Sequence, residues 1–395
     1  MSLTTSHPAM RWAVPGAVVA VVIAAAGLTA ATADASPTLP PRSAAELLVD
    51  VQTASVTALS GTIVQTADLG LPDLPIGMGG RGSADFTSLV SGTHTLRVWY
   101  AGEDQQRLAL LGTLGESDIV RNGSDVWTWS SADNAATHYQ IPTRPDGTEG
   151  TSDVPEAAPE SALAMTPQQA ADAALAAIDP TTIVTTDGTA EVADRAAYEL
   201  VLAPKDAASL IGQVRIAIDA EQHIPLRVRV IAKDGTEPAF EVGFSQISFD
   251  TPGPEQFQFS PPPGATVTDS TLGEGTPDHV APTTPPVGAE DDAAGTGTEP
   301  TVVGTGWTSV LVATLPPVDP ADPADPTGPS TDGTGSGASV AGELQSVLGT
   351  LPQVSGDWGS GRLLTSTLFT VLITDDGRIF GGAVGPDALY AAAAQ

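Results

Sequence analysis

The feature that most constrains the fold of this chain is a series of short segments in which apolar and polar residues alternate. Residues 213–218 read Gln-Val-Arg-Ile-Ala-Ile, and residues 226–230 read Leu-Arg-Val-Arg-Val. Alternation of this kind gives a strand one apolar and one polar face, which is typical of an antiparallel sheet with one face in water. The segments follow one another through short turns and do not alternate with helices, so a doubly wound α/β fold is excluded. We predict a mainly β protein, in which one curved antiparallel sheet holds the strands from residue 60 to residue 249.

Turn sequences divide these segments. Asn122-Gly123 separates a strand predicted over 118–121 from a strand predicted over 125–129. Asn-Gly is the strongest short hairpin signal, because both central residues of a type I′ turn need positive φ. In the same way, Asp187-Gly188 predicts a turn after the strand expected over 181–186.

Two short helices are predicted from their capping residues. Ser43 and Glu46 fit a capping box, in which each side chain satisfies a backbone N–H group that the helix leaves without a partner. A similar pattern begins at Thr166. In both segments the apolar residues that follow share one face at helical spacing. We expect the helices over 43–54 and 167–178 to cover the concave side of the sheet.

The N-terminal segment predicts export. Arg11 precedes an apolar run over 12–28, and Ala31-Thr32-Ala33 fits a signal-peptidase cleavage site. Residues 1–36 are therefore a cleaved signal peptide or, because the run approaches the ~20 apolar residues of a spanning helix, a retained anchor. Both alternatives place the rest of the chain outside the cytoplasm, in the cell envelope or secreted.

The C-terminal part is divided by two stretches with the composition of acidic linkers, over 270–300 and 316–339. The elements expected around them are a strand over 301–315, a short helix over 344–351, a hairpin over 363–384 and a closing helix over 386–394. Too few residues remain for a large independent core. We expect this extension, residues 301–395, to pack on the main sheet, to extend it or to form a small second sheet.

Composition excludes several classes of function. With 47 acidic residues against 15 basic ones, the net charge is −32, which excludes nucleic acid as a partner because phosphates are bound by clustered Lys and Arg. No cysteine is present, so disulfides, thiolate metal sites and lipidation at cysteine are excluded. The five histidines form no H-x-x-H pair, and no G-x-S-x-G motif occurs. We expect no enzyme, no metal and no cofactor.

Three segments, in this order, carry a resemblance to a known family. Asp118–Trp129 has a strand, an Asn-Gly turn and a Trp-bearing strand; Tyr198–Lys205 has an apolar strand followed by Ala-Pro-Lys; Phe257–Val267 reads F-x-F-x-P-P-x-G-x-x-V. Together with the first helix they resemble the outer-membrane lipoprotein carrier (LolA-like) family, in the form found in high-GC Gram-positive bacteria.

The resemblance implies an unclosed antiparallel β-barrel over residues 43–269, with short helices over its concave side and an apolar cavity that holds acyl chains. It also implies a functional arginine near the early strands, for which Arg97 and Arg107 both fit. The residues expected to line the cavity are Leu96, Val98, Val214, Ile216, Val228, Val230 and Phe244. Alternatively, these residues form an ordinary core beneath the helices.

Two functions are compatible with this fold. The first is a carrier of a lipid or an acylated protein. The second is an extracytoplasmic sensor that uses the same barrel to regulate an anti-sigma factor, which would give the chain a membrane protein as its partner. Copurified lipid favours the carrier, and a copurified membrane protein favours the sensor.

Overall fold

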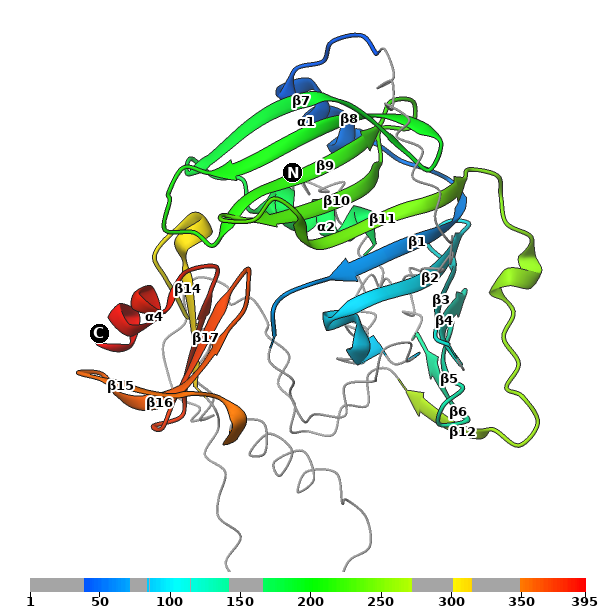
Figure 1. Ribbon diagram of the computed structural model, residues 1–395. Coiled ribbons are helices and arrows are strands. Elements are labelled where there is room, and N and C mark those ends of the chain that lie inside the picture. The colour runs from blue at the N-terminus through cyan, green and yellow to red at the C-terminus, as the bar shows by residue number, and fades with distance from the viewer. Residues whose placement is uncertain are drawn as a thin grey trace, which may run out of the picture. The chain divides into compact units, whose positions relative to one another are not determined.

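The computed structural model describes residues 39–71, 84, 86–113, 115–141, 166–271, 301–314 and 349–395 (Figure 1). The chain divides into two compact units, of which the first takes in Met1–Leu69, Gly79–Lys205 and Ile211–Ala281. The second takes in Gly70–Met78, Asp206–Leu210 and Pro282–Gln395. The predictions for residues 1–36 and 316–339, and most of those for 270–300 and 344–351, lie outside the described residues.

The first unit is built on one 12-stranded sheet, which curves without closing into a barrel. All neighbouring strands are antiparallel except β12 and β6, which are parallel at one edge. The predicted fold class is therefore confirmed. In the order of the sheet, the strands are β12 (Thr266–Thr271), β6 (Ala135–Gln140), β5 (Asp125–Ser130), β4 (Glu116–Asn122), β3 (Gln105–Leu111), β2 (Gly92–Tyr100), β1 (Leu59–Ala67), β11 (Pro238–Ser248), β10 (Pro225–Ala232), β9 (Ile211–Asp219), β8 (Arg195–Pro204) and β7 (Thr182–Val192).

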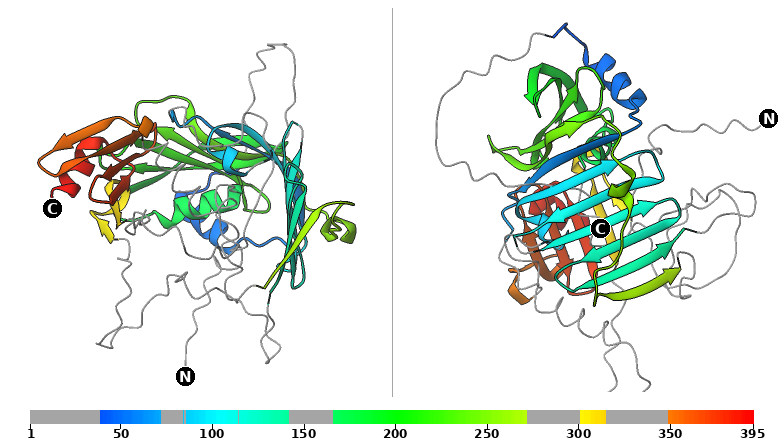
Figure 2. Two further views of the ribbon diagram at one scale, coloured as in Figure 1. Left: turned by 90° about the horizontal axis from the view of Figure 1, so that it is seen from below. Right: turned by 90° about the vertical axis from the view of Figure 1, so that its right-hand side faces the viewer.

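Both predicted helices and their caps are present. Helix α1 (Ala44–Thr53) begins at a complete capping box, in which the Glu46 backbone N–H donates to Ser43 Oγ over 3.3 Å and the Ser43 N–H donates to Glu46 Oε2 over 2.8 Å. Helix α2 (Pro167–Ala176) begins in the same way at Thr166. Helix α1 lies against β7 and β8, and α2 lies against β10 and β11, both on the concave side of the sheet (Figure 2).

Two 3-10 helices complete the first unit. The helix η2 (Phe86–Val90) lies beside β1 and β2. The helix η4 (Pro254–Phe257) lies against β3 and β4, on the convex side of the sheet. The segment that carries the predicted F-x-F motif therefore covers the back of the sheet.

One predicted turn is shifted and another is wrong. Strands β4 and β5 form the predicted hairpin, but Asn122 pairs with Asp125, and of the turn residues only Gly123 has a positive φ, of 64°. The two loop residues are therefore Gly123 and Ser124, with glycine first as in a type II′ turn. Asp187-Gly188 makes no turn: it forms a bulge within β7, where Gly188 has a φ of 69°.

The turn that follows β7 is made by residues that give no turn signal. Ala193 and Asp194 both have positive φ, of 53° and 59°, between the paired residues Val192 and Arg195. This is the φ pattern of a type I′ turn without glycine. The pairing of β7 with β8 imposes this conformation.

The second unit contains a six-stranded sheet of its own, with the order β13-β14-β18-β17-β16-β15. The strand expected over 301–315 is two strands, because η5 (Gly306–Thr308) interrupts it. Helix α4 (Pro386–Ala393) covers this sheet, and Leu372, Phe380 and Leu389 are each at most 1% exposed. The strands are β13 (Thr301–Val303), β14 (Val310–Thr314), β15 (Gln353–Gly356), β16 (Gly359–Thr365), β17 (Thr370–Thr374) and β18 (Arg378–Gly382).

Candidate functional site

The concave face of the 12-stranded sheet carries rows of apolar side chains that run across several strands. In one half of the sheet, the strand register places Phe244, Ile63, Leu96 and Leu110 side by side on β11, β1, β2 and β3. Residues paired in register point to the same face of a sheet. The row therefore forms one apolar surface.

The other half of the sheet repeats this arrangement. Leu200, Ile216, Val228 and Val242 are paired in one row across β8, β9, β10 and β11. A parallel row consists of Leu202, Val214, Val230 and Phe240. All seven residues that the sequence assigned to the inward face therefore share the concave face, while their part in ligand binding stays a prediction.

Most of these side chains are buried in this structure. Leu96, Val214, Ile216 and Val228 are 0–3% exposed and Phe244 is 8% exposed, whereas Val98 and Val230 are half-buried. Leu96 belongs to a cluster with side chains of η2 and of the neighbouring strands: Phe86, Leu89, Leu108, Leu110, Ile119, Val126 and Ile141. The concave face is thus covered from η2 at one side to α1 and α2 at the other.

Helix α2 covers its part of this face with small groups. Its buried residues are Pro167, Ala170 and Ala171. The strands that α2 contacts, β10 and β11, carry Val and Phe side chains on the concave face. Because the hydrophobic contribution grows with the apolar area removed from water, a face of alanine methyl groups holds a helix less strongly than a face of leucine or isoleucine. The fully buried residues of α2 are therefore smaller than those of α1, which buries Leu47 and Val51.

A buried polar side chain, next to His94, lies within the apolar concave face, and sequence reasoning missed it. Gln65 on β1 is 1% exposed and is paired with Val242 of β11 and His94 of β2. Its Nε2 donates to the Leu89 carbonyl oxygen over 3.0 Å, but its Oε1 accepts no hydrogen bond from any residue that the structure describes. A buried amide oxygen without a donor is costly. The only signal in the sequence is a polar residue at an inward position of β1.

The convex face has the opposite chemistry, because it buries carboxylates beside arginines. Asp118 is 1% exposed, and both Nε and Nη2 of Arg107 lie 2.8 Å from its Oδ1. Burial raises the pKa of Asp118 to about 6, although the Arg107 charge and hydrogen bond oppose the rise. The face also carries a second group, in which Glu199 Oε2 accepts from Arg215 over 2.7 Å and Oε1 accepts from Arg229 over 2.5 Å.

A third buried carboxylate on this face is held ionised. Asp219 is fully buried and contacts the Arg195 guanidinium, and it accepts from the backbone N–H groups of Glu221 and Gln222 over 2.9 and 2.6 Å. Burial opposes ionisation, but the hydrogen bonds together outweigh it and hold the pKa of Asp219 below its usual value. Asp219 therefore fixes the turn between β9 and β10.

Both candidates for the functional arginine of the resemblance lie on the convex face. Arg97 is exposed and alternates along β2 with Leu96 and Val98, and Arg107 is bound to Asp118. Because successive side chains of a strand point to opposite faces, neither arginine reaches the concave apolar surface.

Among the residues that the structure describes, no group of three or more His, Asp or Glu side chains is placed to hold a metal ion. No helix among the same residues is long and apolar enough to cross a membrane.

Comparisons with known proteins give structural similarities only. No protein-family model and no curated protein sequence matches the chain. The MucA/MucB complex of Pseudomonas aeruginosa matches with 14% identity over 89% of this chain and 96% of that chain, at a TM-score of 0.40. An uncharacterized conserved protein from Thermus thermophilus matches with 13% identity over 57% and 99%, at 0.32. The LolA superfamily protein NE2245 from Nitrosomonas europaea matches with 11% identity over 55% and 99%, at 0.21.

Proposed function

We propose that this protein is an exported, non-enzymatic carrier that binds a lipid or the acyl chains of a lipoprotein on the concave face of the 12-stranded sheet. The observation that carries the proposal is the continuous apolar surface formed by the paired rows from β8 to β3. An acyl chain needs only apolar area, and it gains about 0.8 kcal/mol per buried CH₂ group.

Helix α2 is the element that a ligand would displace. Its buried face of Pro167, Ala170 and Ala171 contributes few methyl groups. An acyl chain of about a dozen CH₂ groups covers more of the same sheet surface than these residues do, so the exchange favours the ligand. Val230 on β10 is only half-buried, and we expect the acyl chain to enter there.

Gln65 gives the ligand a polar end. Its Oε1 can accept a hydrogen bond, so the proposal favours a ligand with an N–H or O–H group near its acyl chain over a pure hydrocarbon. An N-acyl group and a partly acylated glycerol both carry such a donor.

Native mass spectrometry of the protein from its own cell envelope, combined with displacement of a fluorescent fatty acid, tests the carrier. We expect a bound lipid mass, and we expect Val230→Glu to abolish binding because it places a charge on the apolar face. The matched control is Val267→Glu on β12, where the side chain is 46% exposed; it should bind as the wild type does. If circular dichroism shows that Val230→Glu does not fold, Val98→Glu in the other half of the sheet replaces it as the test variant. A clean protein mass with no displacement contradicts the proposal.

A regulatory sensor is the second candidate, and an exposed apolar pair in the second unit favours it. Val302 on the edge strand β13 is 63% exposed and pairs with Leu311 on β14, which is 50% exposed. An edge strand with exposed apolar residues is suited to pairing with another protein. The partner in this case would be the extracytoplasmic segment of a membrane-bound anti-sigma factor.

Affinity purification from membranes separates the two functions. The sensor predicts that a membrane protein copurifies with the wild type and is lost from the Val302→Lys, Leu311→Lys double variant. The carrier predicts that the double variant still binds fluorescent fatty acid with unchanged affinity.

A further inference from the structure

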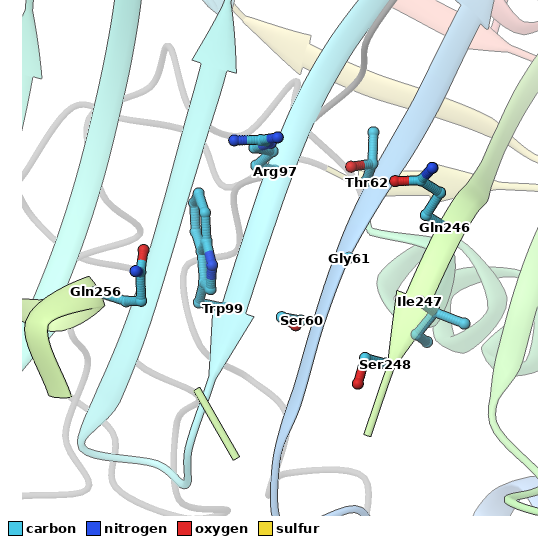
Figure 3. Close-up of a pocket in the computed structure, with 9 residues that line it drawn as sticks. All are labelled: Ser60, Gly61, Thr62, Arg97, Trp99, Gln246, Ile247, Ser248 and Gln256. Carbon is cyan, nitrogen blue, oxygen red and sulfur yellow. The ribbon is translucent and has the colours of Figure 1, made fainter. Parts of the chain in front are cut away.

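A polar hollow with a volume of about 440 Å³ lies on the convex face of the 12-stranded sheet, where β2, β1 and β11 run side by side (Figure 3). It lies within the first unit and does not involve the apolar concave surface. The side chains that matter are Arg97 and Trp99 from β2, Ser60 and Thr62 from β1, and Gln246 and Ser248 from β11. Gln256, from η4, lies at the rim opposite Gln246.

The strand register arranges these side chains in two rows. Arg97 pairs with Thr62, which pairs with Gln246; Trp99 pairs with Ser60, which pairs with Ser248. β11 has a bulge at this level, between the partners of Thr62 and Ile63. A bulge bends a strand and redirects its side chains, which is how sheets often form sites on their faces.

Arg97 differs from the other arginines of the convex face. Arg107 is bound to Asp118, Arg195 to Asp219, and Arg215 to Glu199. Arg97 makes no hydrogen bond and no ion pair with any residue that the structure describes. In a chain with a net charge of −32, a cation that stands beside a hollow without a carboxylate partner is the group that an anion would bind.

Trp99 gives the hollow a flat, fixed surface. The Arg107 guanidinium lies 5.3 Å from the centre of the Trp99 ring, and Arg107 is itself fixed by its two contacts with Asp118. The ring is therefore held by a cation–π contact on a rigid partner. Such an indole offers a planar apolar face beside the hydroxyl and amide groups of Ser60 and Gln246.

Only side chains are available to recognise a ligand at this place. β1, β2 and β11 are interior strands, so their backbone N–H and C=O groups are used in pairing with their neighbours. A peptide that binds by adding a strand needs a free sheet edge, and these interior strands do not offer one. A sugar ring fits better, because its C–H face covers an indole ring and its hydroxyl groups bond to Ser, Thr and Gln side chains.

We propose that this hollow, named the Arg97–Trp99 pocket, binds a sugar ring that carries a carboxylate or phosphate group, as in an acidic polysaccharide of the cell envelope. The ring stacks on Trp99, the anionic group forms a bidentate contact with Arg97, and the hydroxyl groups of the sugar bond to Thr62, Gln246 and Gln256. Arginine suits this role because its planar fork matches both anions. The volume lies within the range of about 300–1,000 Å³ that is usual for ligand pockets.

Isothermal titration calorimetry of the full chain with three probes tests the pocket. The probes are oligoglucuronic acid, glucose 6-phosphate and uncharged maltotriose, at one ionic strength. We expect the wild type to bind at least one of the two anionic probes, at least tenfold more tightly than maltotriose, and the stronger of them identifies the anionic group. Arg97→Gln and Trp99→Ala should each weaken that binding at least tenfold, and Arg97→Lys should weaken it less than Arg97→Gln.

Matched controls separate the pocket from general effects of charge and aromatic content. Trp127→Phe changes an aromatic residue on the same face outside the pocket, and Arg42→Gln removes an arginine paired with Asp50; both should bind as the wild type does. The proposal is overturned if neither anionic probe binds, if maltotriose binds as tightly, or if Arg97→Gln and Trp99→Ala bind with wild-type affinity.

Discussion

The two faces of the 12-stranded sheet bury side chains of opposite chemistry: apolar groups on the concave face and paired charges on the convex face. On the concave face, Ile216 and Val228 are buried among apolar neighbours, and their burial requires no particular partner atom. On the convex face, Asp118, Glu199 and Asp219 are at most 5% exposed, and each one is held by arginine. Hydrophobic burial is non-directional, whereas a buried charge needs fixed donors at hydrogen-bonding distance.

This difference is the reason why we propose the concave face as the binding surface for acyl chains. Under that proposal, a helix with a small apolar face is exchanged for another apolar body, and no polar partner is left unsatisfied. On the convex face the same exchange would separate carboxylates from their arginines. The faces therefore combine an adaptable side with a rigid one, and the Arg97–Trp99 pocket lies on the rigid side.

The largest expected effect comes from a cavity in the concave face. Leu96 is fully buried in the cluster around η2. We expect Leu96→Ala to lower the free energy of unfolding by about 3–5 kcal/mol, since it removes apolar contacts and leaves a void. Val267→Ala, at an exposed position of β12, should change it by less than about 0.5 kcal/mol. Urea denaturation measures both, and equal effects would mean that the concave face is not the core.

The next effect concerns pH and the convex face. The pKa of Asp118 is raised to about 6 by burial, so the folded state keeps a proton that the unfolded state releases. This contribution to stability is complete below about pH 4 and is lost as the pH rises through 6, with a total of up to about 3 kcal/mol. We therefore expect the stability of the wild type relative to Asp118→Asn to fall from pH 4 to pH 7, measured by denaturant unfolding.

Asp219 provides the opposite case on the same face. Its pKa lies below the usual value, so its contribution to stability is present at neutral pH and is lost as the pH falls through the folded pKa. The stability of the wild type relative to Asp219→Asn should accordingly rise with pH in the acidic range. If the stability differences measured with Asp118→Asn and Asp219→Asn changed with pH in the same direction, the opposite pKa shifts of the two carboxylates would be contradicted.

A smaller loss is expected when the shared carboxylate is neutralised. Glu199 lies at 2.5–3.5 Å from Arg229, Arg215 and Arg227. The side chains of these arginines are about a quarter exposed or less, and Glu199→Gln leaves them without a common anion. We expect the free energy of unfolding to fall by about 2 kcal/mol. Glu221→Gln removes a carboxylate that is 76% exposed and pairs with Arg195; its effect in the same unfolding assay should stay below about 0.5 kcal/mol.

The smallest effect tests α2 as the adaptable cover. Thr166→Ala removes the N-cap of α2 and should destabilise that helix by about 1 kcal/mol. Hydrogen exchange should then be faster in α2 while β9 and β10 keep their protection, and fluorescent fatty acid should bind more tightly. Ser43→Ala makes the matched change in α1. If the two variants alter fatty-acid affinity equally, α2 has no special place in binding.

The sequence by itself determined the local elements. The boxes at Ser43 and Thr166 predicted where both helices begin, because a cap depends on residues three positions apart. Alternation predicted the strands and which side chains share a face, because this depends only on the period of two. The rows that contain Ile216 and Val228 therefore follow from the sequence together with the pairing of neighbouring strands.

Only the tertiary structure decided what depends on partners far apart in the chain. Gly188 has the positive φ expected at a turn, but the pairing of β7 with β8 uses it in a bulge and places the turn at Ala193-Asp194. Long-range pairing also decided that β12 runs parallel to β6 and that Trp99, Ser60 and Ser248 lie in one row. A local pattern predicts that a strand has two faces. The register of long-range pairing, which is fixed by the burial of the whole core, decides which side chains become neighbours on each face.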